Sequence, residues 1–447
     1  MNSEIKVLSY PNGELQRVQV VRLDSWERLS FLQPLAAREA LDCFADIYRK
    51  YLVPACPWLF GNMVLFRLPE DVKLPDGFRG RNCGIAGDFL TNASALIRDQ
   101  VWFLGGKPHF RSEAAKSFWE DLEARDCIRL VRGRLPVTTP IPVKDCSGYL
   151  SRTETEAALK VNASFFIMDR FDCASVYDHV GTPIGLCVKD GTVINPPLFG
   201  REALLVGRDG TVRVKPVKLE DLTLEIRGNT FRPGVDTIVY SRPDRNRTPK
   251  SGYKKLVIVG CRVAAVVTGG KAAIPASGFV LCVPPETEAA PGDPVIYRGM
   301  EDVAFGIQVG NSAVIDGKKT ERFLSRFYNI RHFQRVPFPP SLYPMNYKKA
   351  RAARIVLGAD REGKPMLLWA EGASKNRYLP GEDSCGASLK EMADICCELG
   401  MVNGVHLDGG GSAQILLKNH RSLRTSDRNL EDNSDAERPI PLALILK

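Results

Sequence analysis

Beyond about residue 160 the sequence is divided into short apolar runs that are separated by turn-forming dipeptides. Asp-Gly pairs occur at 190–191, 209–210 and 316–317, each between segments rich in β-branched residues. Asp-Gly favours tight hairpin turns because positive φ angles cost little at these two residue types. Glu362 and Gly363 separate two further apolar runs in the same way. We therefore expect an α+β fold, with a strand-rich mixed sheet and few helices in the C-terminal unit.

One helix in this unit is strongly indicated. Ser388 is a suitable N-cap residue, and Glu391 three positions later completes a capping box. An apolar stripe at helical spacing follows, and Gly400 supplies the glycine that often ends a helix. Glu391 is therefore assigned to the helix start and not to catalysis.

The N-terminal part of the chain has a different pattern, which predicts a smaller α/β domain over 1–145 and a second domain over 146–447. Apolar residues at helical spacing predict helices over 35–52 and 112–125, the second opening on a serine that suits an N-cap. The proline-containing segment 135–145 suits an extended connector. A chain of 447 residues has room for two or three structural units. The sequence suggests no role for the first of them.

Composition is that of an ordinary globular protein, with 44% hydrophobic and 25% charged residues. No apolar run approaches the roughly 18 residues that a membrane helix needs, and the first residues lack the pattern of a secretion signal. We therefore expect a cytoplasmic protein that has no membrane partner. The 12 cysteines are scattered without a CxxC pair, which favours reduced, mostly buried thiols, although an even count leaves disulfides open. The net charge of +9 fits an anionic substrate or weak affinity for nucleic acid, and does not separate the two.

The motif DGGGS at 408–412 is the most informative in the chain. Strands expected at 402–407 and 413–417 enclose three consecutive glycines, which cost conformational entropy and contribute no packing. One explanation is a tight, bulged turn that Asp408 caps. The other is a close approach of the backbone to a ligand, with the amides of 409–412 facing an anion and Asp408 at the rim. The motif is neither a Walker loop nor a GxGxxG motif.

Several segments, in order along the chain, resemble one family. They are VNASFF (161–166), PIGLCVKDG (183–191), FRPGVDTIVYS (231–241), IPASGFVL (274–281), FGIQVGNSAVIDGK (305–318), ARIVLGADREGKPMLLWAEG (353–372), GASLKEMADICCELGMVNGVHLDGGGS (386–412) and ERPIPLAL (437–444). Any one of them is a weak signal, but the ordered set is similar to the catalytic domain of the phosphodiester glycosidases over roughly residues 146–447. Glu371 and Ala373 depart from the family, which usually has Asp and Arg at these positions. Ala163 and Ser164 replace two glycines of the family pattern.

The resemblance implies a hydrolase that cleaves the bond between the anomeric carbon of a sugar and the oxygen of a phosphodiester. Asp408 is then the first candidate for the catalytic carboxylate and Glu371 the second, since the reaction passes through an oxocarbenium-like carbon. Arg354 would hold the phosphate through two parallel hydrogen bonds, which lysine cannot form. The substrate would be an anionic small molecule, a sugar-1-phosphodiester or a nucleotide sugar, and no cofactor is expected.

Five further residues complete the site that the resemblance implies. Asn162 would bind a sugar hydroxyl or the attacking water. Backbone amides would share the negative charge of the phosphate. These amides belong to Gly409, Gly410, Gly411 and Ser412.

Each of the side-chain candidates also has a plainer explanation. Asp408 would only cap its turn, Arg354 would be a surface charge at a strand edge, and Glu371 would be solvated at a strand end. Asn162 would only satisfy backbone groups. His406 is expected to be a packed and hydrogen-bonded residue, and because no cluster has the spacing of zinc ligands we expect no metal site.

The basic segment 241–255 favours a second class of function. It carries six lysines and arginines with Tyr253 among them. It is either a solvated loop, a contact for phosphate backbones, or a segment that closes over an anionic substrate. The alternative to the glycosidase is therefore a non-hydrolytic protein on the same fold that binds nucleotides or nucleic acid. Binding of nucleic acid remains possible but is not favoured.

Overall fold

The structure is a computed structural model, and its described residues cover most of the C-terminal two thirds of the chain. Backbone and side chains are described for residues 1–32, 108–125, 149–153, 156–167, 175, 177–178, 181–197, 200–241, 247–320, 351–373, 379–427, 434–435 and 437–446. The backbone alone is described for residues 63–66, 85–86, 89–91, 101–104, 107 and 128–131.

A seven-stranded antiparallel sheet forms the centre of the C-terminal part. Its order is β1 (Asn2–Ser9), β2 (Leu15–Arg22), β28 (Pro365–Ala370), β27 (Arg354–Ala359), β29 (Asn403–His406), β25 (Ser312–Ile315) and β26 (Lys318–Lys319). Strands β27 and β28 are buried along their whole length, as expected for continuous apolar runs that are covered on both faces.

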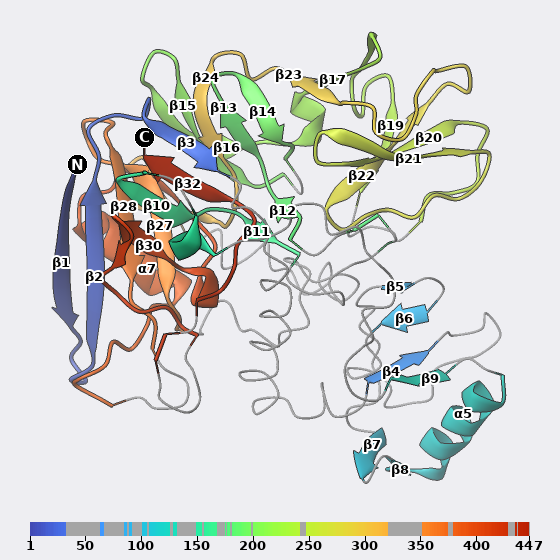
Figure 1. Ribbon diagram of the computed structural model, residues 1–447, viewed down its shortest axis with the longest axis horizontal. Coiled ribbons are helices and arrows are strands. Elements are labelled where there is room, and N and C mark those ends of the chain that lie inside the picture. Colours follow the sequence, from blue (N-terminus) through green and yellow to red (C-terminus); the bar gives the residue numbers. More distant parts are fainter. Residues whose placement is uncertain are drawn as a thin grey trace.

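Helix α7 (Leu389–Glu398) covers one face of this sheet. Its buried residues Met392, Ala393 and Cys396 pack against Val356 and Leu368. The opposite face packs on a five-stranded antiparallel sheet, so that Trp369 and Ile355 share a core with residues of β10 and β32. This second sheet has the order β3 (Leu29–Leu32), β32 (Ala443–Leu446), β10 (Leu159–Asn162), β30 (Ile415–Leu417) and β31 (His420–Arg421). Figure 1 shows β1 and β2 at the left edge of the molecule, next to these layers.

The remaining strands form smaller antiparallel sheets. One has the order β14 (Thr192–Asn195), β13 (Cys187–Lys189), β24 (Val303–Ile307), β15 (Glu202–Gly207) and β16 (Val212–Pro216). Others comprise β18 (Asn229–Phe231), β17 (Thr223–Ile226) and β23 (Ile296–Arg298), and then β19 (Ile238–Ser241), β22 (Gly278–Val283), β20 (Lys254–Val259) and β21 (Arg262–Thr268). The shortest is the pair of β11 (Phe165–Phe166) and β12 (Pro183–Ile184).

Part of the N-terminal region folds apart from these sheets in the view of Figure 1. It contains a sheet of β5 (Ile85–Ala86), β6 (Phe89–Thr91), β4 (Met63–Phe66) and β9 (Ile128–Val131), and a hairpin of β7 (Val101–Leu104) and β8 (Lys107–Phe110). Helix α5 (Glu113–Ala124) begins after Ser112, whose hydroxyl accepts a hydrogen bond from the amide of Ala115 at 3.1 Å. The helix predicted at 112–125 is therefore present, whereas 35–52 and 135–145 lie outside the described residues.

The predicted local signals in the C-terminal part are confirmed. The Ser388 hydroxyl accepts from the amide of Glu391, and the Glu391 carboxylate accepts from the amide of Ser388 at 2.8 Å. Gly400 follows α7 with a φ of 87°. The turns at 190–191 and 316–317 have positive φ at both residues and join β13 to β14 and β25 to β26.

The strand-rich α+β class is also confirmed, and the ladders among the described strands are antiparallel. Residues 1–32 supply β1 and β2 to the central sheet and β3 to the five-stranded sheet. The proposed division into 1–145 and 146–447 stays a prediction, and this pairing shows that the first 32 residues share their sheets with the C-terminal part. Within the described residues, Cys187, Cys261, Cys282, Cys385, Cys396 and Cys397 are free thiols. No helix in that part of the chain is both long and apolar enough to cross a membrane.

Candidate active site

Asp408 and Arg354 come together at the end of the β27–β29 ladder. Val356 lies opposite His406, and the amide of Leu407 donates to the carbonyl of Ile355 at 2.9 Å. The pairing of the two strands ends at Val356 and His406, and Arg354 and Asp408 lie just beyond it. The charge of Arg354 acts on the Asp408 carboxyl group, so the two side chains are close. The two residues that the sequence marked as first candidates are thus neighbours.

The Asp408 carboxyl group is in an unusual environment. The residue is partly exposed, and its amide donates to the carbonyl of Ala163 at 3.1 Å. Burial raises the pKa of its carboxyl from the ordinary value of 3.8 to about 6, although a hydrogen bond from Ser412, the charges of Arg438 and Arg354, and the amide of Gly409 favour the ionised form. Desolvation therefore outweighs four stabilising contacts. A carboxyl group with a pKa near 6 is suited to proton transfer close to neutral pH.

Arg354 is buried and not the exposed surface charge of the plainer explanation. Its side chain is 6% exposed, and its Nε donates to the carbonyl of Ala387 at 3.0 Å. A Cβ atom on Gly409 would lie 3.5 Å from its Cδ and Nη1 atoms. The guanidinium is therefore fixed at the start of β27, beside the glycine turn and Asp408.

Asn162 connects β10 to the loop that carries Asp408. Its Nδ2 donates to the carbonyl of Asp408 at 2.7 Å, and its Oδ1 accepts from the amide of Gln414 at 2.8 Å. The side chain is 1% exposed. Both ends of the amide are thus used to hold the two sides of the glycine turn, which is the plainer explanation offered by the sequence. Its role in binding substrate stays a prediction.

Two of the three glycines are needed for the structure of the turn, independently of any ligand. Gly410 has a φ of 64°, in the left-handed region that favours glycine. A Cβ atom on Gly411 would overlap the carboxylate of Asp427 and the guanidinium of Arg438. The glycines thus permit a tight turn at Gly410 and a close approach of the backbone at Gly411. The group approached is the buried ion pair of Asp427 and Arg438.

The amides of this turn are largely bonded within the protein. The Gly410 amide donates to the carbonyl of Ala353 at 2.8 Å, and the Ser412 amide donates to the carbonyl of Gly409 at 3.2 Å. The Gly409 amide bonds the Asp408 carboxylate. Whether any amide of 409–412 also binds substrate stays a prediction.

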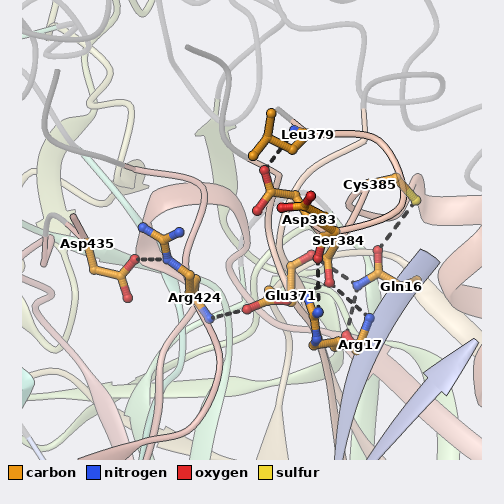
Figure 2. A network of polar contacts seen from close by, with 10 residues as sticks. Gln16, Arg17, Glu371, Leu379, Asp383, Ser384, Cys385, Arg424 and Asp435 are labelled. Carbon is orange, nitrogen blue, oxygen red and sulfur yellow. Dashed lines mark hydrogen bonds and ion pairs between the residues drawn. The ribbon is translucent and has the colours of Figure 1, made fainter. Parts of the chain in front are cut away.

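Glu371, the second candidate carboxylate, lies in a dense polar network that Figure 2 shows. Its Oε2 accepts from the Ser384 hydroxyl at 2.5 Å and from Arg17 Nη1 at 3.3 Å, and its Oε1 accepts from the amide of Arg424 at 3.1 Å. The residue is 6% exposed, so it is not the solvated strand end of the plainer explanation. These contacts favour a structural role, and its catalytic assignment stays a prediction.

Sequence reasoning missed two charged residues beside the glycine turn. Arg438 is 9% exposed and donates from Nε and Nη2 to one oxygen of Asp427, at 3.1 and 2.7 Å. Its Nη1 donates to the hydroxyl of Ser412 at 3.3 Å. Arg438 belongs to the segment ERPIPLAL, which entered only as one piece of the family resemblance. A buried charge within an apolar segment was the signal that could have found it.

His406 and Asn311 form an unpaired polar pair next to Asp408. The His406 amide donates to the carbonyl of Asn311 at 2.9 Å, so these residues are neighbours across β29 and the segment before β25. Their side chains are 3% and 2% exposed, yet neither imidazole nitrogen and neither amide atom has a hydrogen-bond partner. Burial and the charge of Arg354 lower the pKa of His406 to about 3, so the ring is neutral. The histidine is packed as expected, but without the expected hydrogen bond.

Two further expectations concern metals and the basic segment 241–255. Among the described residues no group of three or more His, Cys, Asp or Glu side chains could hold a metal ion. Of the basic segment, Lys255 is buried and donates to the carbonyl of Gly270 at 2.5 Å, while Lys254 donates to the carbonyl of Thr287. Residues 242–246 lie outside the described part. Two of its six cations are therefore bonded internally.

Comparison with known proteins defines the class. Residues 262–447 match the family model of the phosphodiester glycosidases, which confirms the resemblance seen in the sequence. The matched range covers less than half of the chain, and it contains Arg354, Glu371, Asp408 and Arg438. Asn162 precedes the matched range.

Two related proteins are both named N-acetylglucosamine-1-phosphodiester alpha-N-acetylglucosaminidase. The protein from Mus musculus is 37% identical over 82 residues, which are 18% of this chain and 14% of the relative. The protein from Homo sapiens is 35% identical over 82 residues, with the same shares. The matched segment thus spans about one seventh of the length of these curated relatives.

Similarity to solved structures is weak. A hypothetical protein from Synechocystis has a TM-score of 0.44 at 14% identity, covering 99% of this chain and 61% of the other. The zebrafish N-acetylglucosamine-1-phosphodiester alpha-N-acetylglucosaminidase catalytic domain, auto-inhibited by its pro-peptide, has a TM-score of 0.39 at 12% identity, covering 100% of this chain and 82% of the other.

Proposed function

We propose that this protein is a hydrolase that cleaves the glycosidic bond of a sugar-1-phosphodiester. The observation that carries the proposal is the position of Asp408, a partly exposed carboxyl group with a pKa of about 6 that lies close to Arg354 within the range that matches the phosphodiester glycosidase family. Acidic groups with strongly shifted pKa values beside a fixed cation are typical of catalytic sites.

In the proposed reaction the bond between C1 and the phosphodiester oxygen breaks, and its electron pair leaves with the phosphate. A phosphate monoester is a good leaving group because its second pKa is about 6, so little protonation is needed. When the Asp408 carboxylate acts as general base, the oxygen of water bonds to C1 and the water proton passes to the carboxylate. When it acts as nucleophile, its oxygen bonds to C1 as the phosphate leaves; water then displaces it, the bond from Asp408 to C1 breaks, and the water proton passes to solvent.

Arg354 is proposed to bind the phosphate. Its Nε is held by the carbonyl of Ala387, which leaves the orientation of the guanidinium fixed before substrate arrives. A fixed guanidinium loses little entropy on binding and offers the planar geometry that a phosphate matches. The placement beside Asp408 would put the phosphate close to the reacting carbon.

The unpaired polar atoms of His406 and Asn311 support a sugar as the uncharged part of the substrate. A buried donor or acceptor without a partner costs about 1–3 kcal/mol, so a ligand that supplies partners is stabilised. Sugar hydroxyls donate and accept, and can therefore satisfy a neutral imidazole and an amide. His406 lies two positions before Asp408. Asn311 lies next to His406, on the segment before β25.

The rival function, non-hydrolytic binding of nucleotides or nucleic acid, receives less support. Lys254 and Lys255 of the basic segment bond carbonyl groups of the protein. The raised pKa of Asp408, by contrast, is more typical of a reacting group than of a site that only binds phosphate. We also propose a reducing location such as the cytoplasm, which the six described free thiols support.

The proposal is tested by incubating the purified protein with a panel of sugar-1-phosphodiesters and nucleotide sugars. Release of free sugar and phosphate monoester, measured by chromatography, is the expected result. Binding of nucleotide sugars without any hydrolysis, while the protein is folded, would favour the rival function.

A further inference from the structure

The hydroxyl of Ser412 lies between a cation and the Asp408 carboxylate. Ser412 is fully buried, and its oxygen accepts a hydrogen bond from Arg438 Nη1 at 3.3 Å. A guanidinium has only donors, so this contact uses a lone pair of the serine oxygen. The single hydroxyl hydrogen remains for another acceptor, and the contact of Ser412 with Asp408 favours the ionised form of that carboxyl group. The direction of the serine hydroxyl is therefore determined by Arg438.

Asp427 in turn holds Arg438. Nε and Nη2 of the guanidinium donate to a single oxygen of Asp427, which leaves Nη1 directed at Ser412. Asp427 and Arg438 are 8% and 9% exposed, so solvent screens the pair little. Gly411 permits the arrangement, because a side chain at this position would overlap both charged groups.

The segment that carries Asp427 is itself fixed by hydrogen bonds to the site. The Ser426 hydroxyl accepts from the amide of Ala353 at 2.8 Å, and the Ser426 amide donates to the carbonyl of Gly410 at 3.3 Å. The Asp427 amide donates to the hydroxyl of Thr425 at 3.1 Å. Further upstream, the Arg424 amide donates to Glu371 at 3.1 Å. Glu371 is therefore linked to the segment that carries Asp427 by its bond to the Arg424 amide.

We propose that Arg438 is a positioning residue: held by Asp427, it orients the Ser412 hydroxyl so that this group donates to Asp408 and fixes the carboxylate toward the sugar carbon. The inference rests on the proposed function for its catalytic consequence. Its structural part, the orientation of Ser412, holds without any substrate. An ion pair that only anchors the C-terminal strand would not act on Asp408 through Ser412.

The test is a double-mutant cycle of Ser412→Ala and Arg438→Lys, read by the titration of the Asp408 carboxyl group with NMR in the absence of substrate. Lysine keeps the charge but cannot serve Asp427 and Ser412 together, because it lacks the planar fork. We expect Ser412→Ala to raise the pKa of Asp408, since a hydrogen bond to the ionised form is lost. Arg438→Lys should also raise it, and should add nothing in the Ser412→Ala background.

Kinetics supply a second measurement. Both single variants should lower kcat about 10–100-fold, as is typical when a group that orients a functional side chain is removed, with KM changed much less. Arg421→Lys is the matched control, since Arg421 is another arginine near the site that donates to Gln414 at 3.2 Å and not to Ser412. It should leave the Asp408 titration and kcat unchanged.

Three outcomes separate the possibilities. An Asp408 titration that does not move in Ser412→Ala overturns the proposal, as does an Arg438→Lys shift that persists in full when Ser412 is absent. Arg438→Lys could instead lower the melting temperature equally in the parent and in Ser412→Ala while the pKa of Asp408 stays unchanged. That result would mean that the ion pair only anchors the C-terminal strand. A correct cycle in a protein that hydrolyses no sugar-1-phosphodiester would support the positioning role and contradict the proposed function.

Discussion

The two candidate carboxylates, Asp408 and Glu371, have opposite surroundings. Glu371 is 6% exposed and accepts side-chain or amide hydrogen bonds from Ser384, Arg17 and Arg424. Asp408 is partly exposed, and burial still raises its pKa to about 6. A carboxylate whose lone pairs are occupied by the protein contributes to structure, whereas one that is incompletely stabilised can react. The difference is that donors occupy both oxygens of Glu371, whereas at Asp408 desolvation outweighs the contacts that favour the ionised form.

Asp408→Asn should produce the largest effect. The substitution preserves size and one acceptor but removes the charge and the ability to take a proton. We expect turnover of a sugar-1-phosphodiester to fall at least 10²–10⁴-fold, as is typical when a base or nucleophile is lost. Single-turnover hydrolysis measures it, with Asp209→Asn as the control, because Asp209 is an exposed residue that accepts from Thr211 in its own hairpin turn. A near-normal rate for Asp408→Asn would remove Asp408 from the reaction.

Glu371→Ala should act mainly on stability. The Ser384 hydroxyl and the Arg424 amide would lose their acceptor, and hydrogen bonds to charged groups contribute about 1.5–3 kcal/mol each. We expect the free energy of unfolding to fall by about 2–4 kcal/mol, measured by denaturant titration, with substrate affinity kept in the folded fraction. Glu382→Ala, at an exposed position near Arg17, is the control. A stable Glu371→Ala protein without activity would instead return Glu371 to the catalytic residues.

The raised pKa of Asp408 should also appear in the pH dependence of stability. Between its ordinary value of 3.8 and about 6, the folded protein holds a proton that the unfolded chain has released. Stability from this group is therefore present at low pH and is lost as pH rises through about 6. Asp408→Asn has no carboxyl group to ionise, so it does not lose stability as the pH rises. Its free energy of unfolding should exceed that of the parent by about 1–3 kcal/mol at pH 8, since one pKa unit corresponds to about 1.4 kcal/mol.

Denaturant titrations at pH 4 and pH 8 measure this difference. The advantage of the variant should disappear at the lower pH. A variant that is less stable than the parent at both values would mean that Asp408 stabilises its turn in the ionised form, as a simple cap does.

Arg354→Lys should have the smallest effect of the four. Lysine keeps the positive charge but loses the planar pair of donors, and it cannot reproduce the bond from Nε to the carbonyl of Ala387. We expect the affinity for a phosphate-containing product to fall about tenfold, which corresponds to one hydrogen bond of about 1.4 kcal/mol. Isothermal titration calorimetry checks this, and an unchanged affinity would place the phosphate elsewhere.

Much of the local structure could be predicted because its causes are local. The capping box of Ser388 and Glu391 and the Asp-Gly turns are set by residues within four positions of one another. The proximity of Arg354 and Asp408 came from an ordered resemblance and not from physical reasoning on the residues. The pair of Asp427 and Arg438 was not predicted, because an ion pair between two loops leaves no periodic pattern. Nor could the sequence show that Glu371 would meet Arg17, which lies more than 350 positions earlier.

The place of β2 has a consequence for how the chain folds. Strand β2 pairs with β28, and β3 pairs with β32, so residues 15–32 pair with strands more than 300 positions later in the chain. The central sheet therefore has contacts of very high sequence separation, which slow folding because the loop must close before the pairing is gained. During synthesis the N-terminal strands would stay unpaired until the C-terminal segment is made. Their exposed apolar faces would favour aggregation in that interval. A fragment that begins at residue 146 would lack β2 and leave β28 as an unpaired edge.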